Sequence, residues 1–304
     1  MILKAPAKIN LGLDVTGRRP DGYHDVAMVM QSLTLHDRVT LEAFSDSQGG
    51  WRTGPDEKTG TISIRCNLPF IPTDKSNLAY KAAAALMEAK GVTDHLVIEL
   101  DKRIPVAAGL AGGSTDAAAV LDGVNRLFGL GCSDEELRKI GAGIGADIPF
   151  CLMTGTAKAE GIGDILTPLP PMPACGLLLI KPSFSVSTKA VYQALDASPI
   201  SEHPAIDPII EALSEGDLDA LAGRLGNVLE TVTAAQYPVI GELKEALKAE
   251  GALNALMSGS GPTVYGIFRT KEEAHAVREK LRPCFRPMKW IITAPFNKEA
   301  CYDR

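Results

Sequence analysis

The sequence predicts an α+β fold in two domains. The chain has 304 residues, a length typical of two ordinary domains or one large one. Alternating apolar and β-branched residues dominate its first third, whereas several helices are expected before about Lys248. Strands and helices do not simply alternate, which disfavours a doubly wound parallel sheet. We expect an N-terminal domain at 1–157 and a C-terminal domain at 158–304, near a proline cluster that includes Pro168 and Pro173.

In the first half, strands are predicted where apolar residues recur at every second position. These strands are 8–15, 26–33, 39–43, 62–66 and 96–100. A turn cluster, TGRRPDGYH, separates the first two. An Ala-rich segment predicts a helix at 77–90, and an apolar helix is expected at 114–128, after a glycine-rich loop. Ser133 and Glu136 have capping-box spacing, which predicts another helix start.

In the second half, a strand is predicted at 176–180 and is followed by the helical region. The end returns to strand, helix and strand. The strands are 253–258, 263–268 and 290–293. Thr270 and Glu273 are expected to cap the helix between the last two strands.

Charge and cysteine content exclude several classes of protein. Net charge is −6 and the basic segment 280–289 is short, so we expect a solvated surface there and no nucleic-acid partner. The six cysteines include no C-x-x-C pair, which favours reduced cytoplasmic thiols over a zinc or redox site. No apolar run reaches the ~18 residues of a membrane span. The start, MILKAPAKINLGLDV, carries charges and is not expected to be a signal peptide, so we predict a cytoplasmic protein without a membrane partner.

The strongest local signal is the loop PVAAGLAGGSTD at 105–116, between a predicted strand and a predicted helix. Glycines allow backbone N–H groups to turn around an anion, and the helix N-terminus adds further donors. Ser114 and Thr115 can cap the helix or contact a phosphate. A tight strand-to-helix turn is the simpler alternative, but three glycines and three consecutive polar residues favour phosphate binding.

The loop lacks the signatures of the common nucleotide-binding families. No Lys ends it, so it is not a Walker loop, and it does not contain G-x-G-x-x-G. The protein-kinase H-R-D and D-F-G motifs are also absent.

Three separated blocks, together with an aspartate segment, resemble the GHMP kinases. The blocks are APAKINLGL with RPDGYH, the glycine-rich loop, and MSGSGPTVYG at 257–266; the segment is GADIPF around Asp147. Within the family, the first block is most similar to the branch whose acceptor is methylerythritol linked to cytidine diphosphate. The resemblance implies a ribosomal protein S5 domain 2-like N-terminal domain and a ferredoxin-like C-terminal domain, with the active site between them. Ala111 and Thr115 stand where many relatives carry Gly and Ser.

The implied activity is transfer of the ATP γ-phosphoryl group to an acceptor hydroxyl, which requires mainly positioning and charge stabilisation. The implied catalytic residues are Lys8 and Asp147: Asp147 would orient or deprotonate the hydroxyl, and Lys8 would neutralise the transferring phosphoryl group. Without the resemblance, an edge-strand charge for Lys8 and a helix N-cap for Asp147 would be preferred. Magnesium is expected to enter with ATP, without a dedicated protein metal site.

The resemblance also implies binding residues. For ATP they are Pro105, Ala107, Ala108, Gly109, Leu110, Ala111, Gly112, Gly113, Ser114 and Thr115, with Asn77 and Lys102 near the base or ribose. For the small-molecule acceptor they are Asn10, Tyr23, His24, Asp147, Thr188, Tyr192, Gly259 and Ser260. The pair Tyr23 and His24 is expected to meet the cytosine, although a hairpin-turn pair is the alternative. Lys102 could equally be a surface charge, and 259–261 a plain hairpin turn.

Two other functions remain as alternatives. Another GHMP kinase would act on homoserine, mevalonate or a sugar, but such acceptors have no base to be recognised by RPDGYH. A non-catalytic nucleotide-binding regulator would be expected to have lost Lys8 or Asp147, and both are present. The sequence fits a monomer or a homodimer.

Overall fold

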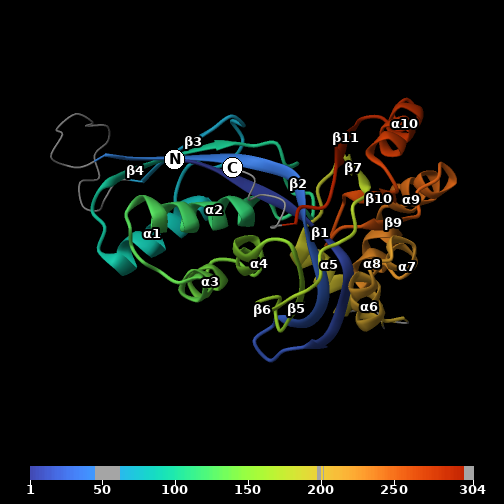
Figure 1. The fold of residues 1–304 in the computed structure, drawn as a ribbon, viewed down its shortest axis with the longest axis horizontal. Coiled ribbons are helices and arrows are strands. Elements are labelled where there is room, and N and C mark those ends of the chain that lie inside the picture. Colours follow the sequence, from blue (N-terminus) through green and yellow to red (C-terminus); the bar gives the residue numbers. More distant parts are fainter. Residues whose placement is uncertain (45–61, 197–199, 201, 298–304) are drawn as a thin grey trace. The chain divides into compact units, whose positions relative to one another are not determined.

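The computed structural model describes residues 1–44, 62–196, 200 and 202–297 (Figure 1). It divides into two compact units, each built from several chain segments. Unit 1 contains Met1–Ala5, His36–Ile104 and Gly112–Met153; unit 2 contains Pro6–Leu35, Pro105–Ala111 and Thr154–Arg304. The predicted linear division at 157/158 stays a prediction. Five of the six cysteines carry free thiols, and Cys301 lies outside the described residues.

The order of elements is that of an α+β protein, as predicted. The strands are β1 (Ile2–Arg18), β2 (His24–Phe44), β3 (Ile62–Cys66), β4 (His95–Asp101), β5 (Thr156–Glu160), β6 (Ile165–Pro168), β7 (Gly176–Pro182), β8 (Gly226–Asn227), β9 (Asn254–Met257), β10 (Val264–Phe268) and β11 (Met288–Thr293). The helices are α1 (Leu78–Lys90), α2 (Gly112–Leu127), α3 (Asp134–Ala142), α4 (Ile148–Met153), α5 (Thr188–Asp196), α6 (Ile206–Glu215), α7 (Leu218–Gly223), α8 (Val228–Gln236), α9 (Val239–Ala249) and α10 (Lys271–Leu281).

Unit 1 places helices against β3, β4 and the second half of β2, which are strands of a seven-stranded mixed sheet. Strand β4 pairs in parallel with β3 and antiparallel with the second half of β2, where Arg38 is opposite Asp101. Helices α1 and α2 lie side by side (Figure 1). The predicted capping box forms on α3, between Ser133 and Glu136. Asn77 caps α1, a role that was not predicted for it.

Unit 2 contains the first half of β2, most of β1, and a separate four-stranded antiparallel sheet. In this sheet the strand order is β11-β7-β10-β9. Its core includes Ile180, Leu243, Met257 and Phe268, which are all buried. Strand β1 pairs in parallel with the short strand β8, through Gly12 opposite Gly226. Strand β5 pairs with β2 and β6.

Several predicted boundaries were wrong for local reasons. The strands predicted at 26–33 and 39–43 are one strand, β2, because no Gly or Pro interrupts the intervening residues. Helix α2 begins at Gly112 and not at Ser114, although glycine is a poor helix former. Strands β5 and β6 and helix α4 were not predicted. Each is only four to six residues long, too short for a clear periodic pattern.

Candidate active site

Lys8 and Asn10 lie on the same face of β1, because they are two residues apart in a strand. Lys8 is 5% exposed and Asn10 is fully buried. The Lys8 ammonium donates to the Asn10 side-chain oxygen at 2.8 Å, and the Asn10 amide lies 3.3 Å from the Met28 sulfur. The alternative interpretation of Lys8 as an exposed edge-strand charge is therefore wrong. Burial of an ammonium group is unfavourable for the stability of the fold unless polar partners surround it. A buried lysine at this position is therefore a candidate functional residue.

The three sequence blocks meet within unit 2. The Lys8 backbone N–H donates to the Leu110 carbonyl at 3.2 Å. The Ser258 hydroxyl donates to the Gly109 carbonyl at 2.9 Å. A Cβ added to Gly259 would lie 3.3 Å from the Gly109 oxygen and 3.6 Å from the Asn10 side-chain oxygen. The amino-terminal block, the glycine-rich loop and the carboxy-terminal glycine block thus form one constellation.

The loop holds left-handed backbone at alternate positions. The φ angles are 50° at Ala107, 74° at Gly109 and 57° at Ala111. Such conformations are unfavourable for alanine, and strain of this kind concentrates at functional sites. Because the Gly109 and Leu110 carbonyls accept hydrogen bonds from Ser258 and Lys8, the loop is fixed from its carbonyl side. Of the other predicted residues here, Pro105 and Ala108 are buried.

In unit 1, helix α2 follows the loop directly in the chain. Gly113 is exposed, Ser114 is partly buried, and Thr115 is 1% exposed. The Thr115 hydroxyl and the Asp116 Oδ1 atom are buried and have no hydrogen-bond partner among the described residues. A helix N-terminus with a spare buried hydroxyl fits an anionic ligand.

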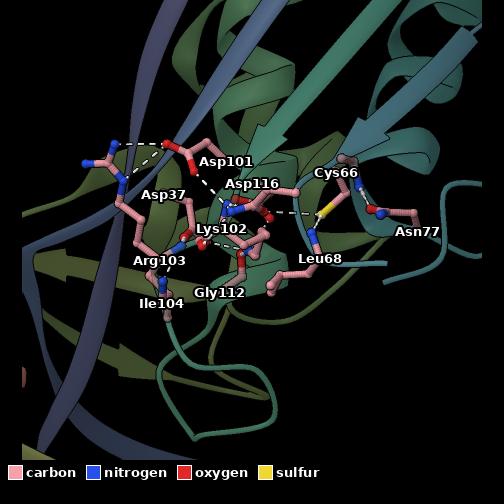
Figure 2. Close-up of polar contacts among 12 residues, drawn as sticks. Asp37, Cys66, Leu68, Asn77, Asp101, Lys102, Arg103, Ile104, Gly112 and Asp116 are labelled. Atoms are coloured by element: carbon pink, nitrogen blue, oxygen red, sulfur yellow. Dashed lines mark hydrogen bonds and ion pairs between the residues drawn. The ribbon is translucent and has the colours of Figure 1, made fainter. Parts of the chain in front are cut away.

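Lys102 does not lie on the surface. It is 8% exposed, and its ammonium forms ion pairs with Asp37 and Asp116 and donates to the Gly112 carbonyl at 3.0 Å (Figure 2). The alternative of a surface charge is therefore wrong. The cluster joins β2, the end of β4 and the first turns of α2, so it fixes the start of the helix against the sheet.

Within this cluster the two carboxylates differ. Asp37 also accepts backbone N–H bonds from Arg103 and Ile104. Asp116 has fewer partners, and burial raises its pKa to about 7 although the Lys102 ammonium opposes that shift. Burial lowers the pKa of Lys102, but the two carboxylates outweigh it and raise that pKa above its ordinary value.

Asn77 and the backbone of Lys102 each take part in hydrogen bonds between a side chain and the backbone within unit 1. The Asn77 side chain accepts from the Ala79 N–H at 2.9 Å and donates to the Pro72 carbonyl at 2.7 Å. The Asn67 side chain accepts from the Lys102 N–H at 2.9 Å and donates to its carbonyl at 3.2 Å. Asn67, Asp37 and Asp116 were not predicted as site residues, because no sequence motif identifies a polar residue whose partners are distant in the chain.

On the acceptor side of unit 2, the structure brings His24 and Tyr192 together. Their ring centroids are 4.8 Å apart, and His24 Nε2 lies 2.7 Å from a carboxylate oxygen of Asp196. The hydrogen bond to His24 lowers the pKa of Asp196. Tyr23 is 61% exposed and lies in the turn before β2. Asp196 was missed, because nothing in the sequence connects it to a residue 172 positions earlier.

Two further predicted residues meet at the start of α5. The Thr188 and Ser260 hydroxyl oxygens are 2.8 Å apart. Ser260 and Gly259 belong to the turn between β9 and β10. The segment is therefore the hairpin turn of the alternative interpretation, and a hairpin turn can also carry the predicted acceptor-binding residues. Thr188 is exposed, whereas Ser260 is buried.

Asp147 lies in unit 1, immediately before α4. It is partly buried, and its carbonyl accepts from the Cys151 N–H at 3.0 Å, as a residue at a helix start does. Among the described residues, no three His, Cys, Asp or Glu side chains are grouped so as to hold a metal ion. No helix in the described ranges is long and apolar enough to cross a bilayer.

The glycine-rich loop is bonded to the strand of a buried lysine and to a second glycine motif, and comparison with known proteins shows the family to which this arrangement belongs. Residues 77–155 match the GHMP kinases N terminal domain, and residues 209–286 match the GHMP kinases C terminal domain. The chain belongs to the GHMP kinase family, and it is a small-molecule kinase with the predicted α+β fold.

Within the family, the chain is similar to kinases that are named for one acceptor. A curated protein of Lachnospira eligens named 4-diphosphocytidyl-2-C-methyl-D-erythritol kinase is 50% identical over 92% of this chain and 93% of its own length. A crystal structure of 4-(cytidine 5'-diphospho)-2C-methyl-D-erythritol kinase is 32% identical, with a TM-score of 0.78 over 98% of this chain and all of its own. A homoserine kinase from Cytophaga hutchinsonii is 17% identical, with a TM-score of 0.69 over 96% of this chain and 94% of its own, and shows the fold alone.

Proposed function

We propose that this protein transfers the γ-phosphoryl group of ATP to a hydroxyl of 4-diphosphocytidyl-2-C-methyl-D-erythritol, giving the 2-phosphate. This reaction belongs to the non-mevalonate biosynthesis of isoprenoid precursors. The observation that carries the proposal is the meeting of all three motif blocks around Lys8, Gly109 and Ser258. Identity of 50% over most of both chains supports the choice of acceptor.

ATP binding is assigned to the glycine-rich loop and the start of α2. The carbonyls of Gly109 and Leu110 are bonded within the protein, so the loop is held in one conformation while its N–H groups are available to phosphate oxygens. The buried Thr115 hydroxyl is a further candidate donor. Asn77 and the Lys102 segment remain our candidates for the base or ribose. We propose that magnesium arrives with ATP, held by phosphates and water.

Lys8 and Asp147 are assigned the chemistry. The Lys8 ammonium would stabilise charge on the transferring phosphoryl group, because its burial leaves little water to screen it. Asp147 would orient the acceptor hydroxyl or accept its proton. Asn10 would hold the acceptor near Lys8, to which its side chain is bonded.

Acceptor recognition is assigned to the cluster around His24. The imidazole and the Tyr192 ring offer a stacking surface with hydrogen-bonding nitrogens at its edge, which suits a cytosine base. Asp196 would fix the orientation of the imidazole. Tyr23, which is exposed beside His24 in the chain, would close over the base. Thr188, Gly259 and Ser260 would line the acceptor site, with Thr188 and Ser260 joined by their hydroxyls.

The test is ADP release by the purified protein with ATP and magnesium, with one acceptor offered at a time. The acceptors are 4-diphosphocytidyl-2-C-methyl-D-erythritol, homoserine, mevalonate and galactose. Turnover with the cytidyl compound alone is expected. Turnover with another acceptor would support kinase activity but would overturn the assignment of His24 and Tyr192 to acceptor recognition. ATP binding without any turnover would favour the non-catalytic regulator.

We also propose a cytoplasmic location and a monomeric or homodimeric state. The absence of a C-x-x-C pair from the sequence and the free thiols of the described cysteines are consistent with the cytoplasm, where thiols stay reduced. The oligomeric state, monomer or homodimer, can be measured by analytical sedimentation at micromolar protein concentration.

A further inference from the structure

Asn227 uses its whole side chain in hydrogen bonds. It is 6% exposed and caps helix α8, where its Oδ1 atom accepts from the Leu229 N–H at 3.0 Å. Its amide nitrogen donates to two carbonyls, those of Met257 and Gly259, both at 2.8 Å. Both amide hydrogens are therefore bonded to the turn that connects β9 and β10.

Helix α8 contacts the same turn through two more side chains. Glu230 accepts from the Met257 N–H at 2.8 Å, and Thr233 donates to the Leu229 carbonyl at 3.2 Å and lies 3.4 Å from the Ser260 carbonyl. Residues three apart share one face of a helix, so this face is directed at 257–260. Asn227 bonds two carbonyls of the turn, on either side of Ser258.

The turn that Asn227 holds is the one that contacts the loop. Ser258 donates to the Gly109 carbonyl, and Ser260 is bonded to Thr188. Gly259 has a φ of 57° and lies against both Gly109 and Asn10. A shift of the turn would therefore displace Ser258, which bonds the loop, and Gly259, which lies beside Asn10.

Asn227 also belongs to the strand pair that carries the catalytic lysine. It lies opposite Leu13 in the parallel pairing of β8 with β1. Lys8 and Asn10 are on the same strand, β1. One side chain thus fixes the turn at 257–260 relative to the strand that presents Lys8.

We infer that Asn227 is a positioning residue for phosphoryl transfer, which sets the turn at 257–260 against the glycine-rich loop and β1. The inference rests on the proposed function. Asparagine is required because the site needs two donors and one acceptor on a short side chain. Serine keeps an oxygen that can cap α8 but cannot reach both carbonyls. Asn227→Ser therefore keeps the cap of α8 and removes the hydrogen bonds to the turn.

The experiment compares Asn227→Ser with Thr270→Ala. Thr270 caps α10 by accepting from the Glu273 N–H at 3.1 Å, and α10 contributes none of the site residues. Asn227→Ser is expected to lower kcat at least ~10-fold with a melting temperature within a few degrees of wild type. Thr270→Ala is expected to lower the melting temperature and to keep kcat within about twofold.

Hydrogen exchange provides a readout that does not depend on turnover. In Asn227→Ser, amide exchange at 257–260 is expected to be faster than in wild type, whereas Thr270→Ala leaves it unchanged. A kcat for Asn227→Ser within twofold of wild type, or unchanged exchange at 257–260, would overturn the inference. If the wild-type protein does not turn over the cytidyl acceptor, the proposed function fails, and the exchange data still test whether Asn227 holds the turn.

Discussion

The hydroxyl of Ser258 donates a 2.9 Å hydrogen bond to the carbonyl of Gly109, across 149 positions of sequence. This bond connects the glycine-rich loop with the carboxy-terminal glycine block. It also fixes the loop from its carbonyl side. Several consequences of this arrangement are open to measurement.

Gly109→Ala is expected to weaken ATP binding at least ~10-fold, because an added Cβ would overlap the Ser258 carbonyl and the φ of 74° disfavours alanine. Isothermal titration with a non-hydrolysable ATP analogue measures this. Gly216→Ala is the matched control, since Gly216 has a φ of 67° and open space around its Cα. Equal loss of affinity in both variants would show that strain alone, and not the Ser258 contact, is responsible.

Ala111→Gly is expected to raise the free energy of unfolding by about 0.5–1 kcal/mol and to keep kcat. Relief of the left-handed strain, about 1–2 kcal/mol, is partly offset by the greater freedom of glycine in the unfolded chain. Denaturant unfolding with a parallel activity assay tests both parts. A loss of activity without loss of stability would mean that the strained alanine itself serves the reaction.

Asp116 predicts a pH dependence of stability. Its folded pKa, about 7, is above its ordinary value of 3.8, so its contribution to stability is complete below about pH 4 and is lost as pH rises through 7. The stability of wild type relative to Asp116→Asn should therefore fall between about pH 4 and pH 7. Denaturant titrations at four pH values measure the difference. Parallel curves for the two proteins would mean that Asp116 stays ionised throughout.

Asp196→Asn is expected to raise the KM for the cytidyl acceptor about fivefold and to change kcat little, because it weakens a hydrogen bond that orients the His24 imidazole. Steady-state kinetics at saturating ATP measure both constants. Asp219→Asn, which removes a carboxylate from an exposed ion pair with Arg269, is the control and should change neither. An unchanged KM in Asp196→Asn would remove His24 from acceptor recognition.

Asp147→Asn is expected to lower kcat at least ~100-fold while ATP affinity stays within twofold, because a positioned base contributes a factor of this size. Asp134→Asn, in the exposed first turn of α3, should behave as wild type. Near-normal turnover of Asp147→Asn would show that another group orients the acceptor hydroxyl.

The sequence predicts the parts of the site that depend on unusual residues close together in the chain. Glycines at 109 and 259, and a lysine and an asparagine in the apolar strand β1, stand out in any pattern, and the structure brings these residues together. The fold class follows from strand and helix patterns in the same way.

The supporting residues could not be predicted, because tertiary contacts alone give them a role. Asp37 meets Lys102 across 65 positions, and Asn227 meets Met257 across 30. In the sequence, Asp37 is a charge between two predicted strands and Asn227 a polar residue in a helical region. Their burial is visible only once the chain has folded, since nothing local requires a partner for either of them.

The pairing of β1 with β8 constrains the order in which the protein can mature during translation. Gly12 can pair only after Gly226 has been synthesised. The Asn10 carbonyl accepts a hydrogen bond from the Tyr265 hydroxyl, 255 positions later in the chain. Contacts of such long range are slow to form, and the edge of β1 opposite β2 has no partner strand until β8 has been made. The segment that carries Lys8 therefore leaves the ribosome early but reaches its native surroundings late, and a ribosome stalled before residue 226 would present β1 with one edge unpaired.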